Sequence, residues 1–148
     1  MRARASTSCE VEPVPRHTRA RAVTAAQVRS YVRKAEEFLA VAGTELTEGR
    51  TIADTSLAIH AAINAADAVT GGRLGKRSAG EDHAQVIALL REAGRDGGEV
   101  ERNLARLLPL KTKAEYDPDE IPKGEATRAL ERASRCVAVA RRVATTQR

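Results

Sequence analysis

The chain has 148 residues, a formal net charge of +5, and a composition of 42% hydrophobic and 30% charged residues. This composition fits one soluble globular domain and excludes a chain that is disordered throughout. No stretch approaches the roughly 20 apolar residues that span a bilayer, and the N-terminus lacks an apolar signal region, so we expect a cytoplasmic protein without membrane contact.

Residues 1–22 form the first predicted segment, a disordered basic tail. This segment has few large apolar residues and contains Pro13 and Pro15. Its five arginines and two glutamates account for +3 of the net charge, which leaves +2 for the remaining residues. The tail is interpreted as an arm that contacts nucleic acid, as a solvated leader, or as the product of an upstream start codon chosen in error.

Two long helices are predicted after the tail. The first begins at Thr24, where Thr24 and Gln27 fit a capping box, and ends at Gly49. The second spans Thr51–Thr70 and ends at Gly71-Gly72. Because this second helix is apolar nearly all round, it should pack on several sides and lie at the centre of the fold.

A basic, glycine-rich loop is predicted over residues 73–80, before a third helix. Ser78 and Glu81 fit a second capping box at the start of that helix, and Gly94 ends it. Residues 95–98 contain two further glycines and predict a non-helical break between the third helix and the next one.

The last two predicted helices span Glu99–Tyr116 and Lys123–Ala144, and residues 145–148 are expected to be a flexible C-terminus. Pro109 should kink or divide the first of them. No segment alternates as a strand, so we predict an all-α fold: an antiparallel bundle of four to five helices over residues 23–144. Alanine-rich faces on the second and fifth helices could receive a second copy, which favours a homodimer.

A polar stripe on the second helix is the first candidate site. Ser56, His60 and Asn64 are spaced by four residues and Asp67 follows three later, so all four lie in one narrow sector between apolar flanks. The stripe is interpreted as a cleft that binds a nucleotide, RNA or a partner. The alternatives are a narrow solvent seam or a satisfied buried network, such as His60 with Asp67.

The run from Leu110 to Tyr116 is the second candidate site. On a helix, Lys111 and Glu115 fall on the leucine-lined face, where they are costly to bury unless they pair or bind a ligand. In the functional interpretation Lys111 and Lys113 contact phosphate, while Glu115 and Tyr116 orient the ligand or the lysines. Alternatively, the lysines complement the helix dipole and Glu115 only pairs with Lys111.

Other polar groups give weaker signals. His83 fits a surface histidine, although Asp82-His83 could support a general base. The glycine-rich run at residues 71–78 lacks the order of a phosphate-binding loop. Cys9 and Cys136 belong to no metal-binding or disulfide pattern, so we expect neither a metal site nor a cofactor.

Four runs of sequence resemble the HEPN domain, a helical-bundle family of higher eukaryotes and prokaryotes. The resemblance extends from Ala22 to Val143. It rests on Tyr31 with Lys34–Leu39, on Ala58–Ala62, on Asp82–Ala84, and on Leu110–Tyr116.

The resemblance implies a bundle of four to five helices that is usually dimeric. Many HEPN proteins are RNases, including toxins of bacterial toxin–antitoxin pairs, and these are often encoded beside a minimal nucleotidyltransferase. Others lack catalysis and bind nucleotides or protein partners. The resemblance therefore implies a homodimer, with RNA, a nucleotide or a nucleotidyltransferase-type antitoxin as candidate partners.

The chain departs from the motif of the RNase members, which is an arginine, a polar residue and a histidine several residues on. Lys111, Thr112 and Tyr116 stand at these places. Lysine lacks the bidentate geometry of arginine, and tyrosine is a poorer proton shuttle than histidine at neutral pH. We therefore expect a catalytically degenerate dimer that binds a nucleotide, RNA or a protein partner.

Two alternatives remain open at the level of sequence. The first is a metal-independent RNase of toxin–antitoxin or defence type that uses Lys111, Tyr116 and His60. The second is a purely structural adaptor bundle.

Overall fold

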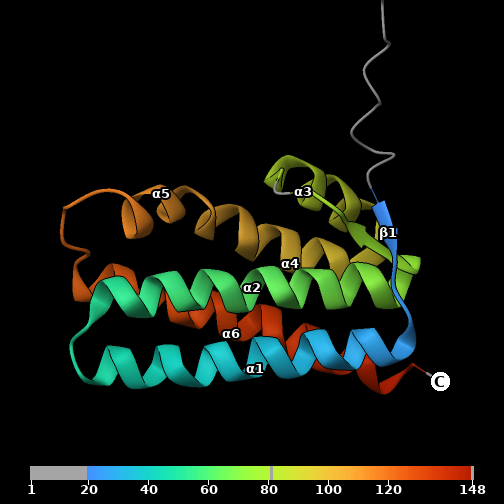
Figure 1. Ribbon diagram of the computed structural model, residues 1–148, viewed down its shortest axis with the longest axis horizontal. Helices are drawn as coiled ribbons and strands as arrows, with labels where there is room; N and C mark the ends of the chain where they lie inside the picture. Colours follow the sequence, from blue (N-terminus) through green and yellow to red (C-terminus); the bar gives the residue numbers. More distant parts are fainter. Residues whose placement is uncertain (1–19, 81, 148) are drawn as a thin grey trace, which may run out of the picture.

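The computed structural model describes residues 20–80 and 82–147, so most of the predicted tail lies outside the described residues. The chain forms a packed helical bundle with a small two-stranded sheet at one end (Figure 1). In order, the elements are β1 (Ala20–Ala22), α1 (Ala25–Thr47), α2 (Thr51–Leu74), β2 (Lys76–Ser78), α3 (His83–Glu92), α4 (Gly94–Leu107), α5 (Pro109–Glu115) and α6 (Lys123–Thr145).

The predicted central position of α2 is confirmed. This helix contacts α1, α3, α4, α5 and α6, with α1 and α6 packed beside it and α4 and α5 along its other side (Figure 1). Its buried face is built largely from small side chains, which let neighbouring helices approach closely. The fully buried alanines are Ala58, Ala61, Ala62, Ala65, Ala66 and Ala68.

The alanine faces expected to receive a second copy are used inside the monomer instead. The alanines of α2 are buried against its own neighbours, and on α6 Ala126, Ala129, Ala133 and Ala140 are at most 1% exposed. Because these small side chains are already covered, the alanine faces do not form the exposed apolar surface that was expected to receive a second copy.

The predicted start of α1 is confirmed. The Thr24 hydroxyl accepts a hydrogen bond from the backbone N–H of Gln27 at 3.1 Å. The Gln27 side-chain oxygen in turn accepts from the backbone N–H of Thr24 at 2.9 Å, which completes the capping box. Gly49 follows the helix with a φ of +80°, as expected for a terminating glycine.

The predicted end of α2 at Gly71-Gly72 is wrong, because the helix continues to Leu74. The helix stops at Gly75, which has a φ of +72°. A Cβ on Gly71 would lie 2.7 Å from Val23 Cγ1, and one on Gly72 would lie 2.3 Å from Val143 Cγ1. These two glycines therefore admit close neighbours to the last turns of a continuous helix.

The purely all-α prediction is also wrong in one detail. Residues 20–22, assigned to the tail, and residues 76–78, assigned to a loop, pair as antiparallel strands with Arg21 opposite Arg77. The backbone N–H of Val23 extends the contact by donating to Gly75 O at 2.9 Å. Strands of three residues are too short to show alternation in a sequence.

Helices α3 and α4 begin differently from the prediction. Asp82, rather than Ser78, caps α3 by accepting from the backbone N–H of Ala84 at 2.9 Å. No break separates residues 95–98 from the next helix, because α4 begins at Gly94 and includes them. Gly97 lies against the last turn of α3, where its Cβ would be 2.1 Å from Leu90 O.

The C-terminal half follows the sequence closely. Pro109 divides the predicted fourth helix into α4 and α5, and α6 spans nearly the predicted residues. Thr145 is the last residue of α6, and the Gln147 side chain then donates to Gly72 O at 3.3 Å. Among the described residues, no helix combines the length and apolar character needed to cross a membrane.

Candidate functional site

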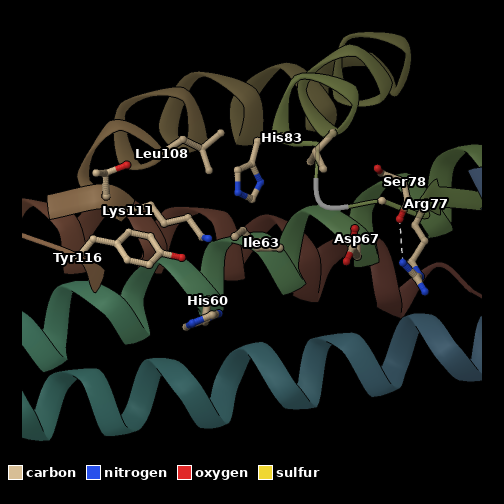
Figure 2. A pocket seen from close by; sticks show the side chains of 12 residues that line it. His60, Ile63, Asp67, Arg77, Ser78, His83, Leu108, Lys111 and Tyr116 are labelled. Carbon is tan, nitrogen blue, oxygen red and sulfur yellow. Dashed lines mark hydrogen bonds between the residues drawn. The ribbon is translucent and has the colours of Figure 1, made fainter. Parts of the chain in front are cut away.

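The main candidate site is a cavity of about 630 Å³ between α2, β2, the start of α3, and the junction of α4 and α5 (Figure 2). Both candidate sites from the sequence contribute to it, because α5 packs against α2. The cavity is lined by His60, Ile63, Asp67, Arg77, Ser78, Gly80, His83, Val86, Leu108, Lys111, Thr112 and Tyr116.

Helix α2 contributes the floor of the cavity through His60, Ile63 and Asp67, which follow helical spacing. The imidazole of His60 lies beside the Phe38 ring, with ring centroids 5.6 Å apart. Its side chain remains 43% exposed, so a ligand in the cavity can reach it.

Glu115 links the two candidate sites, which were separate predictions from the sequence. The Lys111 ammonium lies 3.3 Å from one Glu115 carboxylate oxygen, which confirms the pairing that the alternative interpretation of this run predicted. His60 Nε2 lies 3.7 Å from the other oxygen. Glu115 therefore holds a lysine and a histidine at one wall of the cavity.

Figure 2 shows the polar side chains that border the cavity. The Lys111 and Tyr116 side chains extend over α2, and the His83 imidazole points from the start of α3 into the same space. Tyr116 is 75% exposed and forms the rim. His83 is thus half-buried at the cavity, whereas the sequence favoured an ordinary surface position.

Strand β2 places a second basic side chain at the opposite end of the cavity from Lys111. The Arg77 guanidinium donates to Ser78 O at 2.7 Å and lies over the Tyr31 ring, 5.8 Å from its centroid. The buried Ser78 hydroxyl donates to the Gln85 side chain of α3 at 3.2 Å. These contacts hold Arg77 in place between α1 and α3.

Asp67 is the acidic group of the cavity. Burial raises the pKa of its carboxyl from 3.8 to about 6, and the positive charges of Arg77 and Lys34 partly oppose this rise. The cavity therefore becomes more positive as the pH falls through 6, a change that favours an anionic ligand.

The remaining predicted site residues lie elsewhere. Asn64 is 8% exposed, and its amide donates to the His60 backbone oxygen at 2.8 Å. This hydrogen bond satisfies the amide within α2. Ser56 is half-buried one turn before His60. Lys113 lies 3.5 Å from Glu125 of α6, away from the cavity.

Arg77 was not predicted as a site residue, because its segment, residues 71–78, lacks the order of a phosphate-binding loop. The strand pairing that positions Arg77 has no signal in so short a run. Thr112 was a candidate residue only through the family resemblance. In the structure it lies at the cavity wall.

The described residues contain no cluster of metal-ligating side chains, and their cysteine lies in the core. Within residues 20–80 and 82–147, no group of three or more His, Cys, Asp or Glu side chains could hold a metal ion. Burial, together with the negative charge of Glu99, raises the pKa of the Cys136 thiol to about 12, so this thiol stays protonated in the core. Cys9 lies outside the described residues.

The chain matches no protein-family model and no curated protein.

Proposed function

We propose that this protein is a HEPN-like helical module that binds a nucleotide or a segment of RNA in the cavity between α2 and α5. The observation that supports this proposal is that Lys111, Arg77 and two imidazoles, His60 and His83, line one cavity. Its volume of about 630 Å³ is within the usual range for small-molecule sites. Basic side chains at its two ends suit the phosphate and a second polar part of a nucleotide.

The position of Lys111 also fits the family resemblance. By the resemblance, Lys111 stands where the RNase members carry their motif arginine, a lysine there can still hold a phosphate, and Lys111 lines the cavity. The proposed homodimer and the proposed nucleotidyltransferase-type partner rest on the same resemblance. Sedimentation of the full chain, alone and mixed with such an enzyme, tests both.

Replacing Lys111 by alanine is expected to weaken nucleotide binding at least tenfold, because the cavity loses a positive charge that faces the phosphate. Calorimetric titration with each ribonucleoside 5′-monophosphate and with a 12-nucleotide single-stranded RNA measures the effect. Thermal unfolding of the same variant checks that the fold is intact.

Lys113→Ala is the matched control for this experiment. Both lysines lie on α5, and each pairs with one glutamate, Lys111 with Glu115 and Lys113 with Glu125. Only Lys111 lines the cavity. Equal losses in the two variants would mean that net charge, rather than the cavity, determines binding.

A second function, metal-independent RNA cleavage, is favoured by the position of His60. Cleavage by this set of residues requires His60 to lie near Lys111. In the structure, Glu115 contacts both side chains. Imidazole is the side chain that exchanges protons most readily near neutral pH. His60 and His83 line one cavity and so supply a candidate base and a candidate acid.

The reaction would form a bond between the ribose 2′-oxygen and phosphorus and break the bond from phosphorus to the 5′-oxygen. One imidazole would take the 2′-hydroxyl proton, the other would protonate the leaving 5′-oxygen, and Lys111 would stabilise the charge on the phosphate.

If this second function holds, His60→Ala and His83→Ala should each slow RNA cleavage by about 10²–10⁴-fold. The assay uses labelled single-stranded RNA in the presence of a chelator, with Lys113→Ala as the control variant. RNA that stays intact with the wild-type protein would exclude cleavage and leave the binding function alone.

A further inference from the structure

A second basic site lies on the other side of α5. It is a groove of about 460 Å³ between the end of α4, the start of α5 and the first half of α6. We call it the arginine groove. Its walls are formed by Ala105, Arg106, Pro109, Leu110, Glu125, Arg128, Ala129 and Arg132.

The three arginines of the groove lack carboxylate partners among the described residues. Glu125, the acidic wall residue, instead lies 3.5 Å from Lys113, which offsets its charge. Arg128 and Arg132 are one turn apart on α6, and Arg106 faces them from α4. Like charges brought together by two helices repel one another unless an anion lies between them.

Five arginines elsewhere on the surface differ from this cluster, because each is paired with a carboxylate. Arg73 and Arg142 both contact Asp96, at 2.6 and 3.3 Å, and Arg141 lies 2.6 Å from Glu36. Arg91 and Arg50 also pair with glutamates. The charges of these five arginines are thus offset within the chain, whereas the groove keeps its positive charge available.

The junction of α4 and α5 lies between the arginine groove and the cavity. Lys111 and Thr112 line the cavity, while the preceding Pro109 and Leu110 line the groove. A helix with its side chains is about 10–12 Å across, which a few nucleotides of an extended strand can span. An anion with evenly spaced charges can therefore contact both sites, whereas a mononucleotide cannot.

We propose that the arginine groove binds backbone phosphates of a single-stranded RNA that crosses α5 from the cavity. Arginine forks form bidentate hydrogen bonds with phosphate, and the apolar groove floor can lie against sugars and bases. The path of the strand rests on the proposed function of the cavity, but the charge and geometry of the groove do not.

The test is the binding of a 12-nucleotide single-stranded RNA to the full chain and to the Arg128→Gln/Arg132→Gln double variant. At about 50 mM salt we expect the variant to bind roughly 10- to 100-fold more weakly. Because each phosphate contact on a single strand contributes about 0.7 to the salt slope, the slope should become shallower by about 1.4. Binding of a ribonucleoside monophosphate should stay unchanged.

Arg29→Gln/Arg33→Gln is the matched control. These arginines are exposed, lie four residues apart on α1 and give the same change in net charge. Helix α1 lies on the opposite side of α2 from α4 and α5 (Figure 1). Equal weakening by the two double variants would overturn the proposal, because it would show attraction to net charge alone.

Two further outcomes separate this proposal from the proposed function. RNA binding that depends on Lys111 but not on the groove arginines would keep the cavity function and overturn the groove. RNA binding that depends on the groove arginines but not on Lys111 would keep the groove and overturn the cavity. A deca-glutamate peptide that binds the groove more tightly than the RNA would identify an acidic protein segment instead and overturn the assignment to RNA.

Discussion

Gly97→Ala is expected to lower the free energy of unfolding by about 3 kcal/mol, because the new methyl group has no space. It would lie 2.1 Å from Leu90 O and 2.6 Å from Ala93 Cβ. A backbone oxygen in a helical turn cannot rotate away as a side chain can, so α3 and α4 would have to separate. For a domain of this size the melting temperature should fall by roughly 6–12 °C.

Gly98→Ala is the control and should change stability in the opposite direction. Its methyl group would meet only Arg102, whose terminal nitrogen lies 3.6 Å away in ordinary contact. Alanine is favoured over glycine in a helix by about 1 kcal/mol, so this variant should be slightly more stable than the wild type. Thermal unfolding of the two variants shows whether each substitution raises or lowers the melting temperature. Similar effects in both would contradict a continuous α4 packed against α3.

Asp54→Asn is expected to stabilise the protein at alkaline pH and to have little effect in acid. Asp54 is fully buried in the first turn of α2, and neither carboxylate oxygen has a hydrogen-bond partner among the described residues. Burial raises the pKa of this carboxyl from 3.8 to about 7. The folded state therefore keeps a proton that the unfolded state releases.

Proton linkage determines whether the free energy of unfolding rises or falls with pH. Between about pH 4 and pH 7 the folded state binds more protons at Asp54 than the unfolded state, so the wild type loses stability as the pH rises. The raised pKa corresponds to a loss of at most about 4 kcal/mol, and relaxation of the carboxyl towards water should leave roughly half of it. An asparagine side chain at this position does not titrate, so this part of the pH dependence disappears in the variant.

Urea unfolding at pH 5 and pH 8 measures the effect. The variant should gain about 1 kcal/mol over the wild type between the two conditions, because part of the total loss falls below pH 5. Asp67, whose pKa is also raised, is present in both proteins and cancels in the comparison. Parallel pH profiles for the two proteins would show that Asp54 is charged and solvated in the folded state.

The sequence predicted those parts of the fold that depend on near neighbours. The capping box of Thr24 and Gln27 spans one turn, and Pro109 interrupts a helix wherever that helix lies. The apolar character of α2 indicated a central position because a helix without a polar face has to be covered on every side.

The glycines show where such prediction fails. Gly71, Gly72 and Gly97 were interpreted as ends or breaks, yet each lies within a helix at a close approach to another element. A glycine that ends a helix and a glycine that admits a neighbour look alike in a sequence. Only Gly75, with its positive φ, ends α2.

The candidate site likewise contains some contacts that the sequence predicted and others that depend on tertiary packing. The pairing of Lys111 with Glu115 and the common helical face of His60 and Asp67 were predictable, because both follow from the spacing of residues along one helix. The contact of Glu115 with His60, and the position of Arg77 at the far end of the cavity, depend on how distant segments pack. These side chains meet because helices and strands far apart in the chain lie against one another, and that packing has no signature in the spacing of residues.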